Sequence, residues 1–196
     1  MSTDDRILEA ALRVFLEEGP QATTRRIAQE AGVNEVTLFR RFGKKDHLLV
    51  AAISRDASTR ILPVGPGLDP AAELIAWAGQ AAHGLVRIRG LLRATFEVHR
   101  ASPEVCVRAK DGPVRLRAEL VRWLQQLQAR GVARPQADVE AAAHLLLDGL
   151  FATVMRPDPT IALSPDLDEV VLRYTHLVLS AVGVAVGPPP VPELAC

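Results

Sequence analysis

Hydrophobic residues recur at the spacing of an α-helix along most of this 196-residue chain. Between residues 4 and 18 the pattern predicts one amphipathic helix, which Gly19-Pro20 ends. Asp4 and Asp5 lie near its start, where the helix dipole favours anions. Its apolar face is formed by Ile7, Leu8, Ala11, Leu12 and Phe15. The chain is therefore expected to begin with a helix that is buried on one side.

Two short helices follow, and capping residues indicate their bounds. Thr23 is a good N-cap for a helix over 24–31, which Gly32 can end in the left-handed conformation. Asn34 can cap the next helix, over 35–42. The residues expected to face inward are Ile27, Ala28, Val33, Leu38 and Phe42. Two short helices around a tight glycine turn are the geometry that places a second helix in the major groove of DNA.

The rest of the chain is also helical in pattern. A helix begins near Lys44 and runs towards Arg60, and the segment 62–70, LPVGPGLDP, interrupts the pattern as a hinge or surface loop. Further helices are predicted over 71–86, 88–101, 113–130, 137–156 and 166–182, with only Gly84 and Gly90 to suggest a turn near Arg87. No segment alternates as a half-buried strand does. We therefore predict an all-α fold of about nine helices.

Composition narrows the class of protein. With 48% hydrophobic residues the chain can bury a substantial core, yet no apolar run approaches the roughly 20 residues of a membrane span. The start, MSTDD, lacks the basic and apolar regions of a secretory signal. We expect a cytoplasmic protein that does not act at a membrane.

Charge is balanced over the whole chain, 23 cations against 23 anions, which by itself argues against nucleic-acid binding. Residues 23–47 differ, because they carry three anions, Glu30, Glu35 and Asp46, against a larger number of cations. These cations are Arg25, Arg26, Arg40, Arg41, Lys44 and Lys45. The positive surplus is modest and is concentrated where the two short helices lie.

Signatures of catalysis or metal binding do not occur in the sequence. It contains no G-x-S-x-G, H-E-x-x-H, G-x-x-x-x-G-K or Cys-x-x-Cys motif, and its histidines form no recognisable triad. Cys106 and Cys196 lie far apart without metal-ligand spacing, so we expect a half-buried thiol and a thiol in a disordered terminus, with a redox role for Cys106 as the alternative. We expect no enzyme activity, no metal and no cofactor.

The run from Thr23 to Phe42 resembles the DNA-binding region of the tetracycline-repressor (TetR) family of bacterial transcriptional regulators. The resemblance covers about residues 4–53 and rests on the Gly19 turn, Thr23-Thr24, Ile27-Ala28, Ala31-Gly32-Val33, Thr37-Leu38-Phe39, Phe42, Lys45 and Leu48-Leu49. It implies a helix-turn-helix DNA-binding domain over 1–46 and a helical ligand-binding and dimerisation domain over 47–183. The remaining residues, 184–196, are expected to form a disordered tail.

The resemblance also implies which residues contact DNA. Thr23, Thr24 and Lys45 would bind phosphates, and the alternative is that the two threonines act only as helix caps. Arg25 would reach a guanine edge, and Glu35 would accept from cytosine unless it serves only as a favourable N-terminal carboxylate. The other expected DNA-binding residues are Asn34, Val36, Thr37, Phe39, Arg40 and Lys44. Phe39 departs from the family, which usually has a tyrosine there, so a phosphate-binding hydroxyl is absent.

The resemblance implies a homodimer on a palindromic double-stranded operator, released by an unknown small-molecule effector. The dimer interface is expected at Leu146, Leu150, Phe151, Val154, Val170, Val171, Tyr174, Leu177 and Val178, unless both helices only complete the chain's own core. Candidate ligand-binding residues are Trp77, His83, Phe96, His99 and Trp123, which can also be plain core. Arginines between 87 and 115 suit either an anionic effector or a solvated face. Activation, or loss of DNA binding with the fold kept, is the alternative function.

Overall fold

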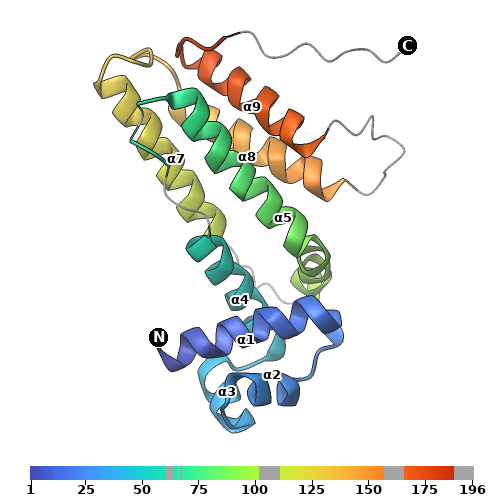
Figure 1. The fold of residues 1–196 in the computed structure, drawn as a ribbon. Coiled ribbons are helices and arrows are strands. Elements are labelled where there is room, and N and C mark those ends of the chain that lie inside the picture. Colours follow the sequence, from blue (N-terminus) through green and yellow to red (C-terminus); the bar gives the residue numbers. More distant parts are fainter. Residues whose placement is uncertain (61–63, 67, 102–110, 157–165, 188–196) are drawn as a thin grey trace, which may run out of the picture. The chain divides into compact units, whose positions relative to one another are not determined.

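The computed structural model describes residues 1–60, 64–66, 68–101, 111–156 and 166–187, and within them the chain is helical with no strand (Figure 1). This agrees with the all-α prediction. The elements are α1 (Thr3–Glu18), a 3-10 turn η1 (Gly19–Gln21), α2 (Thr24–Ala31), α3 (Glu35–Phe42), α4 (Lys45–Arg60), α5 (Pro70–Ala101), α7 (Asp111–Ala129), α8 (Val139–Met155) and α9 (Leu167–Ala181). None of the described helices is long and apolar enough to cross a membrane.

Local capping sets the bounds of the N-terminal helices. The Ser2 hydroxyl accepts from the backbone N–H of Asp5 at 3.1 Å, and the Asp5 carboxylate accepts from the backbone N–H of Ser2 at 3.0 Å, which forms a capping box at α1. These hydrogen bonds, and then Arg55, hold the pKa of Asp5 below its ordinary value of 3.8. Gly32 ends α2 in the left-handed conformation with φ of 63°, so α2 and α3 keep the bounds that the sequence predicts.

Helix α5 differs from the prediction. It runs without interruption from Pro70 to Ala101, so the predicted turn near Arg87 is wrong. A glycine inside a helix costs about 1 kcal/mol relative to alanine, which the buried side chains of Ile88 and Leu91 just beyond Gly84 can offset. Gly84 instead marks a different boundary, between two compact units of the chain.

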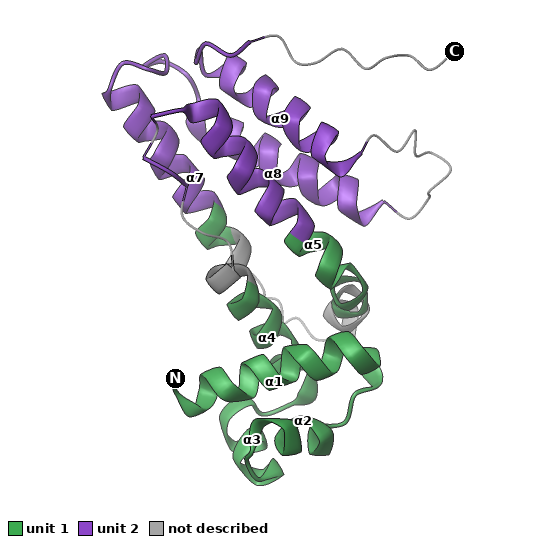
Figure 2. Cartoon of the chain, in the orientation of Figure 1, with its two compact units in different colours: residues 1–61, 84–116 green, residues 62–83, 117–196 purple. Residues whose placement is uncertain are grey.

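The two units are interleaved along the sequence (Figure 2). The first contains residues 1–61 and 84–116, and the second contains residues 62–83 and 117–196. Helix α4 and the later part of α5 thus belong to the same unit as the helix-turn-helix. The predicted functional division at residue 46 lies inside that first unit and stays a prediction.

The first unit is built around a core that joins α1 to α4 with the later part of α5. Ile7, Phe15, Ile27, Leu38 and Leu48 are at most 1% exposed and belong to one apolar cluster. The inward-facing residues that the sequence predicts in α2 and α3 therefore do pack against Phe15 of α1. This core holds the two short helices of the helix-turn-helix in place.

The second unit joins the start of α5 with α7, α8 and α9. Gly149 of α8 permits a close approach to Tyr174 of α9, since a Cβ at this position would lie 2.7 Å from the tyrosine Cε2. At the end of α9, Arg134 Nη2 donates to the carbonyl of Ala181 at 2.6 Å and so caps the helix. Val184, the first residue of the predicted tail, is 5% exposed, so packing extends past 183, whereas residues 188–196 lie outside the described part.

Candidate nucleic-acid interface

Helix α3 presents one face to solvent and buries the other. Val36 is 71% exposed and Phe39 is 45% exposed, and Arg40 lies on the same face. Leu38 is fully buried and Phe42 is 9% exposed, so they attach the helix to the core. Val36 and Phe39, three residues apart on the helix, thus form a small apolar patch on a surface that is otherwise polar. The geometry is that of a helix held ready to contact another surface.

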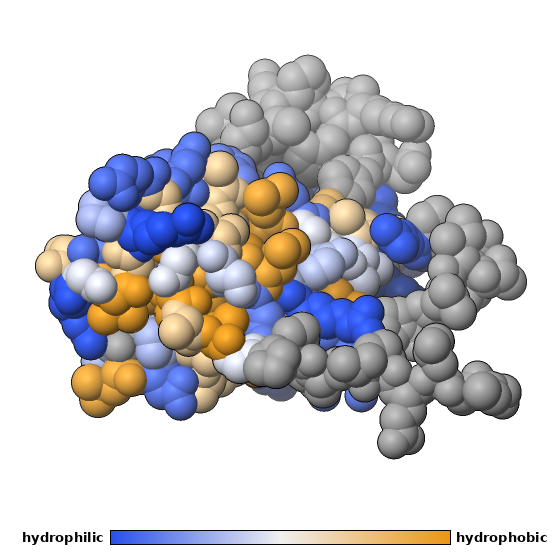
Figure 3. Space-filling view, turned by 90° about the horizontal axis from the view of Figure 1, so that it is seen from above, coloured by the Kyte–Doolittle hydropathy of each residue, from blue (hydrophilic) through white to orange (hydrophobic). Residues whose placement is uncertain are grey.

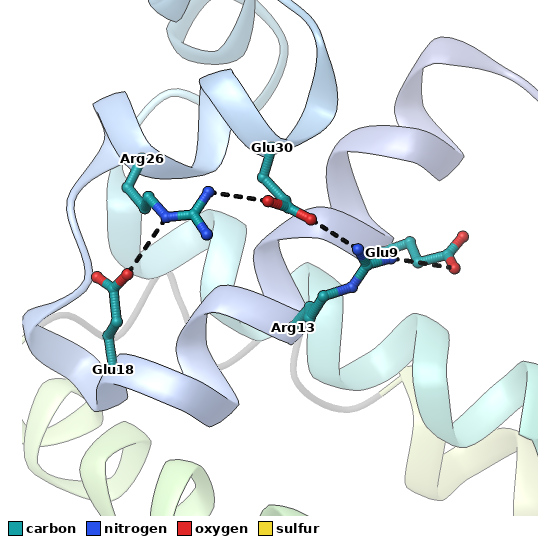
Figure 4. Close-up of polar contacts among 5 residues, drawn as sticks. All are labelled: Glu9, Arg13, Glu18, Arg26 and Glu30. Carbon is teal, nitrogen blue, oxygen red and sulfur yellow. Dashed lines mark hydrogen bonds and ion pairs between the residues drawn. The ribbon is translucent and has the colours of Figure 1, made fainter.

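Five charged side chains hold α2 against α1 (Figure 4). Glu30 of α2 accepts from Nη1 of Arg13 on α1 at 2.6 Å and from Nη1 of Arg26 at 2.8 Å. Arg26 Nε also lies 3.5 Å from Glu18, and Arg13 Nη2 lies 3.9 Å from Glu9. The Arg26 hydrogen bond holds the pKa of Glu30 below its ordinary value of 4.5 and raises the pKa of Arg26. The network attaches α2, the first helix of the helix-turn-helix, to α1, and it engages Arg26 in ion pairs.

The cations of residues 23–47 fall into two groups. Besides Arg26, Arg41 pairs with Asp4 of α1 at 2.5 Å, and Lys45 Nζ donates to the carbonyl of Pro20 at 2.8 Å. An ammonium has three donors, so Lys45 keeps capacity for a phosphate. The remaining three are exposed and make no hydrogen bond or ion pair with another described residue: Arg25, Arg40 and Lys44. These are the cations that are available to an anionic partner.

The two threonines at the start of α2 differ in their hydrogen bonds. Thr23 is the N-cap, and its Oγ1 accepts from the backbone N–H of Arg26 at 3.2 Å, while its own hydroxyl proton has no acceptor among the described residues. The hydroxyl of Thr24 donates to Oε1 of Glu35, the first residue of α3. Asn34 Oδ1 accepts from the backbone N–H of Val36 at 2.9 Å, so Asn34 caps α3 as predicted. The Thr24–Glu35 hydrogen bond has no signal in the sequence, because the two residues are 11 positions apart and meet only across the turn.

The residues predicted for a dimer interface lie mostly in the interior. Six of the nine are buried within the chain itself, namely Leu146, Leu150, Val154, Val170, Val171 and Val178. Phe151 and Tyr174 are partly buried, and only Leu177 is exposed, at 66%. The correction has a physical reason, because the apolar face of an amphipathic helix packs first on its own chain. Leu145 of α8, at 68% exposed, is an outward leucine that is not among the residues predicted for the interface.

The candidate ligand residues are placed differently from one another. Trp77 and Trp123 are 1% and 4% exposed, and neither indole Nε1 has a hydrogen-bond partner in the described part of the chain. His83 lies on the surface, with Nε2 at 2.8 Å from Oδ1 of Asp168, so its predicted place in a pocket wall needs correction. Phe96 and His99 have side chains outside the described residues, and so does Cys106.

Comparison with known proteins agrees with this geometry. Residues 7–52 match the model of bacterial regulatory proteins of the tetR family. The chain is 29% identical over 143 residues to YvkB of Bacillus subtilis strain 168, an uncharacterized HTH-type transcriptional regulator, covering 71% of this chain and 75% of the relative. The fold and the exposed face of α3 define a helix-turn-helix transcriptional regulator.

Solved structures show the same fold over nearly the whole chain. The TetR family transcription regulator SCO0332 superposes with a TM-score of 0.72 at 18% identity, covering 93% of this chain and 99% of the other. The fatty acid degradation regulator FadR from Bacillus halodurans superposes with a TM-score of 0.65 at 18% identity, covering 91% and 95%. The chain is similar to the tetR family of bacterial regulatory proteins through residues 7–52, the part that the family model matches.

Proposed function

We propose that this regulator is a repressor that binds a palindromic DNA operator as a homodimer and leaves it when a small-molecule effector binds. The observation that carries the proposal is the outward face of α3, on which Val36 is 71% exposed and Arg40 makes no hydrogen bond or ion pair with another described residue. A helix of this kind fits the major groove, where the Val36 and Thr37 methyls can meet a thymine methyl. Phe39 contributes only its ring to such a contact.

The cations then divide between positioning and base recognition. Arg40 and Lys44, near the end of α3, suit the phosphates that flank a helix in the groove. Lys45 can bind a phosphate as well while its Nζ still donates to the carbonyl of Pro20. The free hydroxyl proton of Thr23 can donate to a further phosphate. Arg25 is exposed beside it, and its guanidinium matches the two acceptors of guanine.

The dimer face that we propose is narrower than the sequence predicts. It is centred on the exposed leucines of α8 and α9, Leu145 at 68% and Leu177 at 66%. Exposed apolar side chains are common singly, and Figure 3 shows several among hydrophilic neighbours in its view. Two leucines on helices that pack together through Gly149 and Tyr174 are better explained by a second copy that covers them. A two-fold dimer is also what a palindromic operator requires.

An effector site is supported by the interior of the second unit. Buried indole N–H groups normally find an acceptor, and those of Trp77 and Trp123 find none within the described residues. A ligand with hydrogen-bond acceptors would satisfy them. To release DNA, such a ligand must bind the form that cannot bind DNA more tightly than the form that can. The difference between these two binding free energies equals the loss of DNA-binding free energy that the ligand causes.

Selection of bound sequences from a random DNA pool tests the proposal. We expect the wild type to enrich a palindrome and Val36→Glu to enrich none, because a carboxylate on the outward face repels the phosphate backbone. Leu68→Glu is the matched control, since Leu68 is 82% exposed in the second unit and the same charge there should leave selection unchanged. A wild type that enriches nothing, or a Val36→Glu protein that enriches the same palindrome, contradicts it.

Sedimentation equilibrium tests the dimer separately. Leu145→Glu and Leu177→Glu should each shift the protein towards monomer, whereas Leu68→Glu should not. Two variants that remain as dimeric as the wild type would exclude this face.

A further inference from the structure

The start of α2 and the start of α3 are joined by a hydrogen bond that changes the role expected of Thr24. Its hydroxyl donates to Oε1 of Glu35 in a partly buried position. A hydroxyl has one proton to donate, so a Thr24 side chain that holds Glu35 cannot also donate to a phosphate. A phosphate brought to this hydroxyl would meet the Glu35 carboxylate as well, and like charges at short range repel.

Thr23 has the opposite arrangement. Its oxygen accepts from the backbone N–H of Arg26, and its proton remains available for an outside acceptor. The two neighbouring threonines therefore have different functions: Thr23 suits a phosphate, and Thr24 holds a carboxylate.

We propose that Thr24 is a positioning residue for Glu35, and that the held carboxylate makes this regulator select a cytosine in each half of its operator. The inference rests on the proposed DNA binding. Oε1 is engaged by Thr24, and Oε2 makes no hydrogen bond with another described residue. A carboxylate can only accept, so Oε2 selects bases that present an amino group in the major groove.

Cytosine fits this acceptor better than the other three bases. Its N4 amino group is the only polar group that it presents in the major groove, whereas adenine sets the N7 acceptor beside its amino group. Guanine and thymine present acceptors, which a carboxylate repels. Because the Thr24 hydrogen bond is partly buried, it fixes the carboxylate before DNA arrives, and a fixed acceptor discriminates better than a mobile one.

The competing explanation is that Glu35 only complements the positive end of the α3 dipole, as the first residue of that helix. In that case Thr24 and Glu35 would affect folding stability but no base preference. A readout of base preference separates the two explanations, and a stability measurement alone does not.

The test compares the full-length wild type with Thr24→Val, Thr24→Ser, Glu35→Gln and Thr23→Val. Each protein is used in DNA selection, and fluorescence anisotropy then measures its affinity for the selected operator with each base at the position concerned. Far-UV circular dichroism establishes that every variant is folded. Thr24→Val keeps the side-chain shape and removes the donor, Thr24→Ser keeps the donor, and Thr23→Val is the neighbouring control.

We expect the wild type to prefer cytosine over guanine or thymine at one position of each half-site by about 5- to 100-fold, the range of a good base contact. Thr24→Val should lower this preference about fivefold, the effect of one hydrogen bond, and Thr24→Ser should retain it. With Glu35→Gln, the hydroxyl of Thr24 still bonds the amide oxygen and turns the NH2 group outward. That donor should remove the cytosine preference and favour a base that presents an acceptor, which is guanine, thymine or, through its N7, adenine. Thr23→Val should weaken binding to all sequences alike.

Several outcomes would overturn the inference. The inference is refuted if the wild type enriches a palindrome but shows no cytosine preference, or if its cytosine preference is unchanged in Glu35→Gln. Either result leaves the proposed function standing. A Thr24→Val protein that keeps the full cytosine preference refutes the positioning role of Thr24. If Thr24→Val does not fold, Thr24→Ser decides, because it keeps the donor and should therefore keep the preference; loss of the preference in Thr24→Ser refutes the role. A folded wild type that enriches no sequence overturns the proposed function and this inference together.

Discussion

A methyl group added at Gly149 would test how α8 and α9 pack. A Cβ built at this position lies 2.7 Å from Cε2, 3.1 Å from Cδ2 and 3.5 Å from Cζ of Tyr174. Real Cβ atoms do not approach carbon this closely, so the tyrosine ring must leave its rotamer or the helices must separate. The ring is partly buried, and its hydroxyl lies 3.4 Å from Oγ1 of Thr153, so it is not free to swing away.

Two opposing effects determine the size of the change. Overpacking of this kind costs about 1 to 3 kcal/mol. Alanine is favoured over glycine in a helix interior by about 1 kcal/mol, which offsets part of that cost. Gly149→Ala should therefore lower the free energy of unfolding by up to about 2 kcal/mol. Gly79→Ala in α5 is the matched control, because its added Cβ meets nothing within 4 Å, and it should stabilise by up to about 1 kcal/mol.

Urea unfolding followed by circular dichroism measures both variants. The expected result is a lower urea midpoint for Gly149→Ala and a higher one for Gly79→Ala, with unchanged slopes. A second alanine at position 174, Tyr174→Ala, removes the obstacle, so in that background Gly149→Ala should become stabilising. If Gly149→Ala stabilised the wild type as much as Gly79→Ala does, the close packing of these two helices would be refuted.

Three further predictions concern charge and loop structure. Because Arg26 holds the pKa of Glu30 below 4.5, the stability from this pair is present above that pH and is lost as the pH falls below it. Urea midpoints between pH 3 and 6 should therefore fall more steeply in the wild type than in Glu30→Gln, and parallel curves would contradict this. Gln128 Nε2 lies 2.9, 3.2 and 3.0 Å from the carbonyl oxygens of residues 134, 135 and 137, so its two N–H groups share three acceptors. Two of these contacts are exposed to solvent, so Gln128→Ala should lower the free energy of unfolding by about 1 kcal/mol, and an unchanged urea midpoint would exclude the role. Arg40→Ala should weaken binding to all DNA sequences alike and reduce the salt slope by about one for each protomer, whereas equal slopes in a salt titration would refute its phosphate contact.

The helix-turn-helix shows what could be predicted from the sequence. Thr23, Gly32 and Asn34 are local signals, since each cap or turn depends on neighbours within a few residues. The bounds of α2 and α3 were therefore predictable to the residue. The turn predicted near Arg87 failed because Gly84 and Gly90 are equally local signals, and packing of the residues around them overrides a weak preference.

The amphipathic pattern of α8 and α9 correctly indicated which residues are buried, but it could not predict whether they are buried within one chain or at a dimer interface. It identified which residues avoid water, and Leu146 and Val178 do so. Whether they avoid it inside one chain or between two copies depends on how the helices pack, and only the fold distinguishes buried Leu146 from its exposed neighbour Leu145. Periodicity carries no information on the partner that covers a face.

The sequence by itself determined the all-α class and the helix-turn-helix, because these depend on short-range patterns. The tertiary structure decided which of its charges and hydroxyls remain available for DNA. Arg26, Arg41 and Thr24 find partners across turns or on other helices, whereas the donors of Arg40 and the hydroxyl proton of Thr23 have no acceptor in the described part of the chain. Such pairings join residues up to 37 positions apart, and the geometry that brings them within hydrogen-bond distance exists only in the folded chain.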